Sequence, residues 1–340
     1  MKLIRTEDAV GYVIPHDLTQ IIPGEFKGAR FKKGHVVRES DIPVLLSMGK
    51  EHIYILEIGE DMAHEDEGAA VLASISMSAN MSSKAPGEGR IDIFAEEDGL
   101  LKVDAEKLAK VNSIGKLVIA SRHGDTVVRK GDKIAGMRVI PLLIERLTLD
   151  RAREAGAGKP IFSVMPFVRK NCAIITTGSE VASGMVADAF TPVVTSKLAE
   201  FPSTIIGTRV IGDDHAAQTQ AIHDYAAEGA QLIILTGGMS VDPDDRTPLA
   251  IRNSGARIVT YGAPVLPGAM MLVAYYSGGI PVLGLPGCVM YSKRTIFDIL
   301  LPKFFADDPV TNEDIAKLGH GGLCLNCPAC VFPNCGFASH

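Results

Sequence analysis

Between about residue 170 and residue 308 the chain repeats one pattern: a short apolar run, a turn and a helical stretch. Continuous apolar runs of this length are typical of strands buried on both faces of a sheet. Strands that alternate with helices imply a parallel sheet with right-handed crossovers. The pattern predicts an α/β domain over residues 170–308, with helices that include 216–229 and 291–305. Its strands are predicted at residues 172–177, 203–210, 231–236, 257–260 and 281–285.

Two of these strands end in turns that are rich in glycine and hydroxyl side chains. The strand predicted at residues 172–177 leads into Thr177-Gly178-Ser179-Glu180. The strand predicted at residues 231–236 leads into Gly237-Gly238-Met239-Ser240. Glycine lets backbone N–H groups approach an anion closely, and hydroxyl groups add donors. Because ligands of such sheets bind beyond the carboxyl ends of the strands, the turns predict a site for a phosphorylated ligand. The alternative is an ordinary strand-to-helix turn, which a Gly-Gly step alone would favour.

Further residues that follow the strands extend this predicted site. Asp188, Asp214, Asp242 and Asp245 are predicted to manage a metal ion or an oxyanion, because carboxylates are ligands that hard cations prefer. For Asp214, a role as the cap of the helix that begins near Ala216 is as good an interpretation as a role in ligand binding. Pro286-Gly287 ends the last strand, where it would expose backbone near the same edge of the sheet.

The chain is predicted to have four parts. Residues 1–70 form an α+β segment with a helix at 42–49, and residues 71–160 form a β-rich domain with a helix at 105–111. Within the latter, residues 74–90 are rich in Ser, Ala and Gly and are predicted to be a loop or a small-residue binding segment. Residues 170–308 are the α/β domain, and residues 319–340 are a small Cys-rich tail.

The tail carries four cysteines, Cys324, Cys327, Cys330 and Cys335, at two-, two- and four-residue spacings. Four thiolates within a dozen residues can surround one compact metal centre. The run is similar to the cysteine run of bacterial iron–sulfur proteins, whose last spacing is usually three, so an Fe–S cluster is the first interpretation. Zn²⁺ bound by four cysteines is the second, although structural zinc sites more often use two separated pairs. Redox-active thiols are the third.

Charge and hydropathy exclude several other classes of function. The net charge is −6 and there is no basic tract, which argues against nucleic acid as a partner. No apolar run reaches the roughly 20 residues of a membrane span. Acidic residues occur within the first eight positions, before the apolar run that a signal peptide requires, so this segment does not predict a signal peptide. We therefore expect a cytoplasmic protein.

Several of these motifs occur in the order found in the molybdopterin-binding domain of molybdenum cofactor biosynthesis proteins. The resemblance covers about residues 170–305 and rests on residues 176–180, 212–214, 236–240 with 244–248, and 284–287. Residues 31–35 and 41–49 also resemble, weakly, the start of the molybdenumtransferase branch. The resemblance implies a three-layer α/β fold that binds molybdopterin, a pterin with a dithiolene and a phosphate, or its adenylate. It also implies Mg²⁺ at the dicarboxylate positions, a homo-oligomer, and molybdoenzymes or other cofactor biosynthesis proteins as partners.

The sequence departs from the family pattern at three places. Asp188-Ala189-Phe190 stands where Asp-Ser-Asn is common, residues 267–270 lack the lysine of the transferase branch, and Cys288 stands in place of an asparagine. Two functions stay open: an enzyme that inserts molybdate into the dithiolene with release of AMP, and a non-catalytic carrier or sensor with a metal- or redox-responsive tail. A third is a nucleotide-processing enzyme of the same fold that hydrolyses a pyrophosphate.

Overall fold

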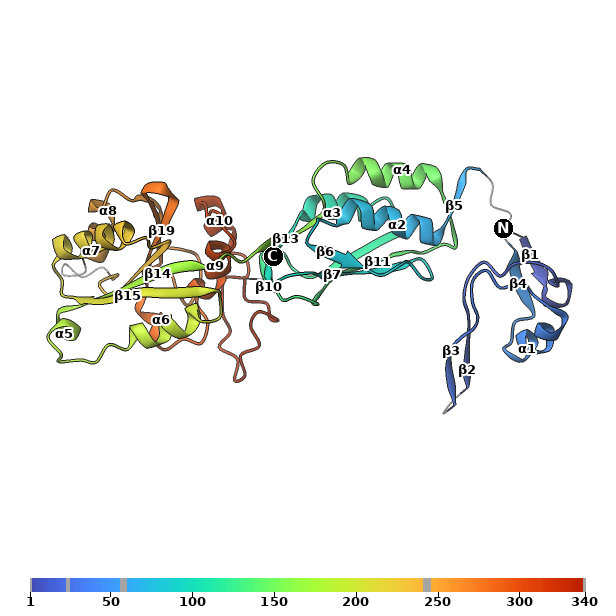
Figure 1. Cartoon of the computed structure of the whole chain (residues 1–340), viewed down its shortest axis with the longest axis horizontal. Helices are drawn as coiled ribbons and strands as arrows, with labels where there is room; N and C mark the ends of the chain where they lie inside the picture. The colour runs from blue at the N-terminus through green and yellow to red at the C-terminus, as the bar shows by residue number, and fades with distance from the viewer. Residues whose placement is uncertain (1, 23–24, 56–59, 241–245, 339–340) are drawn as a thin grey trace. The chain divides into compact units, whose positions relative to one another are not determined.

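A computed structural model describes residues 2–22, 25–55, 60–240 and 246–338 of the chain. The chain divides into two compact units. Unit 1 comprises residues 1–96, 103–122 and 130–163, and unit 2 comprises residues 97–102, 123–129 and 164–340. Figure 1 shows the elements in chain order. The division into four parts stays a prediction.

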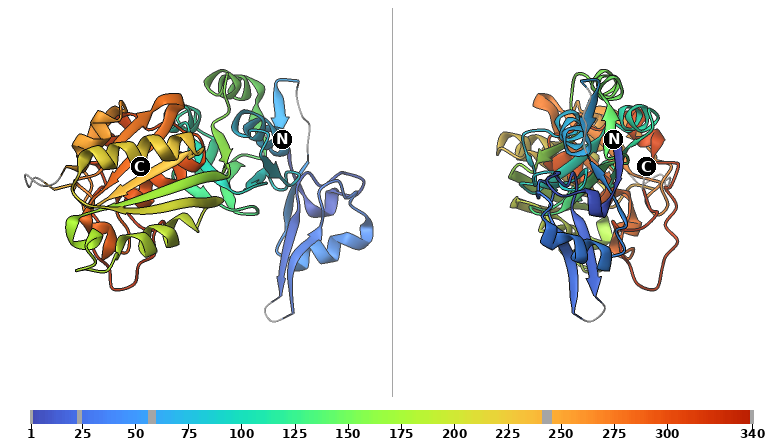
Figure 2. Two further views of the ribbon diagram at one scale, coloured as in Figure 1. Left: turned by 60° about the vertical axis from the view of Figure 1, so that its left-hand side comes forward. Right: turned by 90° about the vertical axis from the view of Figure 1, so that its right-hand side faces the viewer.

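Unit 1 is β-rich, as predicted, and its strands pair antiparallel in small sheets. Its larger sheet has the order β6 (Met81–Ser83), β7 (Arg90–Ala95), β11 (Lys133–Val139) and β9 (Leu117–Ser121). The two-stranded sheets are β1 (Lys2–Arg5) with β4 (His52–Ile55), β2 (Leu18–Ile22) with β3 (Phe26–Phe31), and β12 (Leu143–Glu145) with β5 (Met62–His64). The hairpin β2–β3 extends beyond the β1–β4 pair in both views of Figure 2. The helices of this unit are α1 (Ile42–Ser47), α2 (Glu65–Ser76), α3 (Ala105–Asn112) and α4 (Arg146–Ala155).

The prediction of a loop over residues 74–90 is wrong at the start and in the middle of that segment. Helix α2 continues to Ser76, and β6 occupies Met81–Ser83. The helix that enters this segment packs closely on the sheet through Gly68, which precedes the segment. A Cβ placed on Gly68 would lie 2.9 Å from Cγ2 of Val139 on β11, so α2 lies directly on the sheet. Small side chains were therefore a sign of a tightly packed helix as much as of a turn.

Unit 2 is built on a six-stranded sheet with the order β15-β14-β16-β19-β18-β17. The first four strands are parallel, and β18 pairs antiparallel with both β19 and β17. The strands span β14 (Lys170–Thr177), β15 (Ser203–Ile211), β16 (Leu232–Thr236), β17 (Arg257–Tyr261), β18 (Leu272–Tyr276) and β19 (Ile280–Leu285). A separate three-stranded sheet has the order β10 (Thr126–Val128), β8 (Gly99–Val103) and β13 (Phe162–Pro166).

Helices cover both faces of the six-stranded sheet. α6 (Phe190–Leu198) and α9 (Ile296–Phe305) share one apolar core with Ile174 and Ile234. α7 (His215–Ala227) and α8 (Thr247–Asn253) share a second core with the alternate strand residues Ile175 and Leu235. Figure 1 accordingly shows α7 and α8 on the side of the sheet opposite α6. The predicted three-layer α/β fold with a mostly parallel sheet is confirmed.

Two local predictions in this domain need correction. Strand β18 was not predicted, because it breaks the alternation of strands with helices by running antiparallel between β17 and β19. The helix predicted from residue 291 begins at Ile296. Thr295 caps it, with its hydroxyl accepting from the Phe297 N–H and Asp298 completing a capping box. Unit 2 also contains the short helices α5 (Ser179–Ala182) and α10 (Asn312–Lys317).

Candidate functional site

The two glycine-rich turns meet at one edge of the sheet of unit 2. Strands β14 and β16 are parallel neighbours, and Thr176 pairs in register with Thr236. Strand β15 flanks β14 on one side, and β19 flanks β16 on the other. The segments after all four strands therefore emerge at the same carboxyl edge, where open α/β sheets bind ligands.

A buried hydroxyl pair joins the two turns directly. The hydroxyl oxygens of Thr177 and Thr247 lie 3.0 Å apart, and the Thr247 hydroxyl also donates to the Gly237 carbonyl at 2.9 Å. The backbone N–H of Thr247 donates to the Gly238 carbonyl at 3.2 Å. Because both threonines are buried, these bonds are shielded from water and fix the turns relative to one another.

The Gly-Gly step needs glycine at both positions. Gly237 has a φ of +84°, and a Cβ there would lie 2.3 Å from the Thr177 carbonyl oxygen. Gly238 has a φ of +56°, and its Cβ would lie 2.7 Å from Oγ1 of Thr247. Only a residue without a side chain allows the β16 turn to approach the β14 turn this closely.

Asp188 is held by a set of hydrogen bonds below the end of β14. Its carboxylate accepts from the Thr176 hydroxyl at 3.1 Å, from the Thr191 hydroxyl, and from the N–H groups of Phe190 and Thr191 at 2.9 and 3.0 Å. Burial acts to raise the pKa of Asp188, but these donors hold it below its ordinary value. The residue thus starts α6 and orients Thr176, and its predicted catalytic role stays a prediction.

The loop after β15 is tied to the β14 turn through Asp213. Its carboxylate accepts from the Ser179 N–H at 3.1 Å, and its own N–H donates to the Ser179 hydroxyl at 3.3 Å. Asp214 caps α7 by accepting from the N–H groups of Ala216 and Ala217. The geometry therefore matches the helix-cap alternative for Asp214, which leaves Asp213 as the carboxylate that joins the turns.

The remaining predicted residues differ in exposure along the edge. Glu180, Ser240 and Gly287 are exposed together with Ser179, whereas Met239 and Pro286 are buried. Met239 packs against β19, since a Cβ on Gly284 would lie 2.6 Å from its sulfur. The exposed hydroxyls and backbone around Gly178 and Gly287 are the groups that a ligand at this edge can reach.

Asp242 and Asp245 lie outside the described residues. In the part of the chain that the structure describes, no three His, Cys, Asp or Glu side chains gather into a group that could hold a metal ion. The predicted Mg²⁺ site thus stays a prediction, as does the metal site of Cys324, Cys327, Cys330 and Cys335.

Sequence reasoning gave no site role to three residues of this edge, although Thr247 lies in a motif that carries the resemblance. Thr247 makes the buried hydroxyl pair, Gln218 donates from its amide to the Gly212 carbonyl at 2.9 Å, and the Tyr261 hydroxyl donates to the Met239 carbonyl at 3.0 Å. Thr247 stands immediately before Pro248, and proline in the first turn is a recognised helix-start signal. That signal could have placed Thr247 beside the turns.

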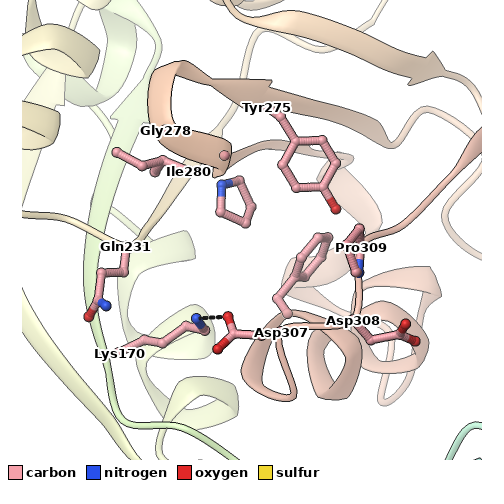
Figure 3. A pocket seen from close by; sticks show the side chains of 11 residues that line it. Lys170, Gln231, Tyr275, Gly278, Ile280, Asp307, Asp308 and Pro309 are labelled. Carbon is pink, nitrogen blue, oxygen red and sulfur yellow. Dashed lines mark hydrogen bonds and ion pairs between the residues drawn. The ribbon is translucent and has the colours of Figure 1, made fainter.

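The opposite edge of the same sheet carries a small cavity of about 230 Å³. Figure 3 shows the ion pair of Lys170 with Asp307 on one side of it and Tyr275 on the other. Its walls come from the amino ends of β14, β16 and β19 and from the segment after α9. None of the predicted site residues lines this cavity, so it is separate from the glycine turns.

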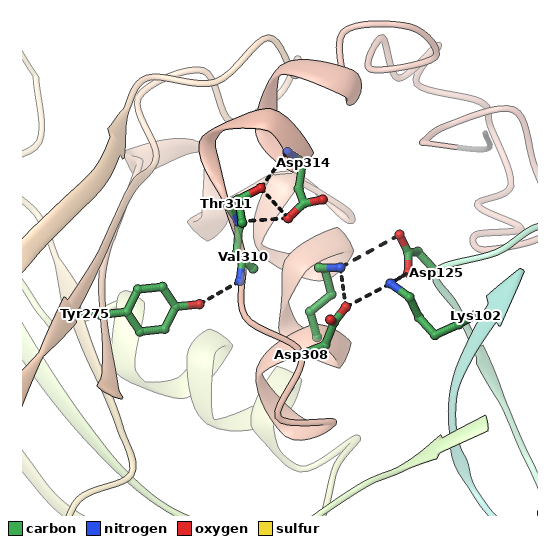
Figure 4. Close-up of polar contacts among 8 residues, drawn as sticks. Lys102, Asp125, Tyr275, Asp308, Val310, Thr311 and Asp314 are labelled. Atoms are coloured by element: carbon green, nitrogen blue, oxygen red, sulfur yellow. Dashed lines mark hydrogen bonds and ion pairs between the residues drawn. The ribbon is translucent and has the colours of Figure 1, made fainter. Parts of the chain in front are cut away.

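Next to this cavity a charged network joins α9 to the strands β8 and β10. Asp308 pairs with Lys303 and, at 2.9 Å, with Lys102, and Asp125 pairs with both lysines (Figure 4). Burial acts to raise the pKa of Asp308, but hydrogen bonds from the two lysines hold it below its ordinary value. This network stabilises unit 2 away from the candidate site.

None of the helices in the described ranges is both long enough and apolar enough to cross a membrane.

Comparisons with known proteins match the segment that contains the glycine turns to a protein family. Residues 173–306 match the family described as "Probable molybdopterin binding domain", and residues 3–57 match a domain of unknown function. A molybdenum cofactor biosynthesis bifunctional protein of Synechococcus elongatus is 36% identical over 83 residues, covering 24% of this chain and 26% of that protein. A protein of Bacillus cereus described as competence-damage inducible is 32% identical over 96 residues, covering 28% of this chain and 23% of its own.

The chain therefore matches about a quarter of the length of these curated relatives. Among solved structures, the molybdopterin biosynthesis enzyme MoaB of Thermus thermophilus has a TM-score of 0.32 at 20% identity, over 39% of this chain and 91% of that one. The glycine turns, the Thr177–Thr247 pair and Pro286-Gly287 all lie within the matched residues 173–306. Over residues 173–306 this chain is thus similar to the molybdopterin-binding domain family, and it shares part of its sequence with a molybdenum cofactor biosynthesis protein.

Proposed function

We propose that the α/β domain binds molybdopterin, or its adenylate, at the carboxyl edge of β14, β15, β16 and β19. The observation that carries this proposal is the meeting of two glycine-rich turns, locked together by Thr177 and Thr247. Backbone N–H groups at such turns and exposed hydroxyls bind phosphate oxygens well. The family match over residues 173–306 supports a pterin as the ligand.

In this proposal the residues divide into those that contact the ligand and those that hold the turns. Ser179, Ser240 and the backbone of Gly178 and Gly287 face the ligand, because they are the accessible groups of the edge. The buried Thr177 holds the turns, together with Thr247 and Gly237. Asp242 and Asp245 would hold Mg²⁺, as the family resemblance implies.

The finer activity that we propose is insertion of molybdate into the dithiolene with release of AMP from adenylated molybdopterin. The two dithiolene thiols bond to molybdenum, and their protons leave with one oxide of molybdate as water. A water molecule attacks the phosphoanhydride bond, its oxygen ends on one of the two phosphates, and molybdopterin phosphate and AMP separate. Bound Mg²⁺ would neutralise part of the charge on the phosphate oxygens. The absence of a lysine at residues 267–270 removes one cation that could share this work.

The test is to mix the purified full chain with adenylated molybdopterin, molybdate and Mg²⁺ and to measure AMP. AMP release that depends on molybdate is the expected result. Tight binding without AMP release would leave the pterin site in place but contradict the transferase activity, which is how a carrier or sensor would behave. Release of AMP without molybdate, or from a plain dinucleotide, would indicate a pyrophosphate-hydrolysing enzyme instead.

A further inference from the structure

Unit 1 contains a cavity of about 400 Å³. Its walls come from or near β2, β4, α2 and β11, and its lining includes residues 16–19, Lys50, Tyr54, Glu65 and Arg138. Pockets that hold small molecules begin at about 300 Å³, so this cavity is large enough for one. The pterin site proposed for unit 2 does not involve any of these residues.

Polar contacts fix the walls of this cavity relative to one another. The Nε2 atom of His64 donates to the Pro15 carbonyl at 2.9 Å, immediately before His16. The Lys33 ammonium lies 3.0 Å from the Nδ1 atom of His64 and also pairs with the Asp66 carboxylate. Because these contacts tie the segment before β2 to the start of α2, the cavity is a constant feature of unit 1.

Glu65 places a buried carboxyl group in the wall of this cavity. The residue is 6% exposed, and within the described ranges its carboxyl group makes no hydrogen bond or ion pair. Gly89 leaves room for that group, since a Cβ there would lie 2.8 Å from Oε2 of Glu65. A buried carboxyl group without a partner costs stability, and proteins retain such groups where a ligand uses them.

His16 adds a second polar atom without a partner. Its Nδ1 atom is buried and has no hydrogen-bond partner among the described residues. Burial, and then the charge of Lys50, lower the pKa of His16, so its ring is neutral at neutral pH. Of the two carboxylates near this ring, Glu88 is exposed and Asp17 accepts from the Lys33 N–H at 2.7 Å. The ring is therefore available to a ligand.

Two cations complete the polar lining. Arg138 acts electrostatically on Glu65, and Lys50 acts on His16. Neither cation forms an ion pair in the part of the chain that the structure describes. The cavity thus has a carboxyl–guanidinium end and an imidazole–ammonium end, and the ring of Tyr54 offers a surface for stacking.

We propose that this cavity binds a small molecule that carries a phosphate and an amino-lactam edge, in which a ring N–H lies between an amino group and a carbonyl. Guanine nucleotides and phosphorylated pterins share this chemistry. Glu65 accepts from the two adjacent N–H groups, Arg138 donates to the neighbouring carbonyl oxygen, and Lys50 binds the phosphate. Adenine presents an acceptor where guanine presents its ring N–H, so it does not match Glu65.

The test is calorimetric titration of the full chain with GMP, neopterin monophosphate and AMP at about pH 8, where Glu65 is ionised. We expect GMP or neopterin monophosphate to bind at least about tenfold more tightly than AMP. Tighter binding of GMP would identify a guanine nucleotide as the ligand, and tighter binding of neopterin monophosphate would identify a pterin. Equal binding of all three, or binding of none, would overturn the proposal.

Variants separate this cavity from the pterin site of unit 2. Glu65→Gln places an N–H group against the donors of the ligand, so it should lose at least about tenfold in affinity without a loss of stability. Glu67→Gln is the matched control, because Glu67 lies on the same helix and pairs with Arg146. It should bind as the wild type does.

Lys50→Gln tests the phosphate end of the cavity. We expect it to weaken the binding of GMP and to leave the binding of guanosine, which has no phosphate, unchanged. Unchanged affinity of Glu65→Gln for both GMP and neopterin monophosphate would overturn the proposal and leave the pterin site of unit 2 untouched. The failure of either site is therefore distinguishable from the failure of the other.

Discussion

At the scale of single residues, Gly237 gives the sharpest test of how the turns are built. Gly237 and Gly255 have the same φ of +84°, but a Cβ on Gly255 meets nothing within 4 Å. Gly255→Ala should therefore cost about 1 kcal/mol, the usual penalty for an alanine in the left-handed region. Gly237→Ala adds a clash with the Thr177 carbonyl, so its loss in the free energy of unfolding should exceed that of Gly255→Ala. Chemical denaturation measures both, and equal losses would contradict the close approach of the turns.

Thr247 is predicted to matter for ligand binding, because it holds the two turns together. Thr247→Val keeps the shape of the side chain but removes the bonds to Thr177 and Gly237, so we expect a roughly tenfold loss of pterin affinity. Thr219→Val is the matched control, because its hydroxyl bonds only to the carbonyls of His215 and Ala250. Calorimetric titration of both variants checks this. Equal affinities would exclude Thr247 from the site.

The raised pKa of Glu65 in unit 1 predicts that the stability of the protein depends on pH. Burial, and then the charge of Asp66, raise the pKa of Glu65 from 4.5 to about 7, and only 6% of the residue is exposed. Because the folded state binds this proton more tightly, the contribution of Glu65 to stability falls as the pH rises from 4.5 to about 7 and is constant above that range. Glu65→Gln should remove this dependence and gain up to about 3 kcal/mol above pH 7.

The control for Glu65 is Glu67→Gln, since Glu67 lies on the same helix but is largely exposed beside Arg146. Thermal unfolding across about pH 5 to 8 is the measurement. A Glu65→Gln profile parallel to that of the wild type would contradict the raised pKa.

At the scale of elements, the network that joins α9 to β8 and β10 contains one buried ion pair and one exposed ion pair. Lys303 is buried beside Asp308, whereas the side chain of Asp125 is 52% exposed. Asp308→Asn leaves a buried lysine poorly paired and should cost about 3 kcal/mol, while Asp125→Asn should cost less than about 1 kcal/mol. Denaturant midpoints of the two variants check this, and equal losses would contradict the predicted difference between the buried and the exposed ion pair.

The same network predicts the behaviour of unit 2 in acid. The pKa of Asp308 is below its ordinary value, so its contribution is present at neutral pH and is lost as the pH falls through that lowered pKa. Asp308→Asn should thus lose less stability between neutral and acidic pH than the wild type does.

The elements also show what the sequence could predict. The strands of the α/β domain were predictable to within about two residues, because a strand buried on both faces reads as a continuous apolar run. Strand β18 has the same composition but runs antiparallel, and direction is set by the connections of the sheet rather than by the residues of one strand. In unit 1 the last residues of α2, 74–76, were read as the start of a loop, because composition alone does not separate close packing from a turn.

At the scale of the whole molecule, the sequence could predict where a ligand would bind but not which residues hold the site together. The carboxyl edge followed from the order of strands and helices. The Thr177–Thr247 pair did not, because it joins residues 70 positions apart and both side chains lie on buried surfaces. Likewise, Asp214 and Asp213 are adjacent in sequence, and only the path of the backbone decides which caps α7 and which joins Ser179.

The central claim is that the two joined glycine turns form the pterin site, and one measurement tests it most directly. Adenylated molybdopterin should be titrated into the wild type, Gly237→Ala and Gly255→Ala at a temperature where all three remain folded. We predict that the wild type and Gly255→Ala bind with the same affinity and that Gly237→Ala binds at least about tenfold more weakly. Equal binding by Gly237→Ala, or absence of binding by the wild type, would contradict the claim.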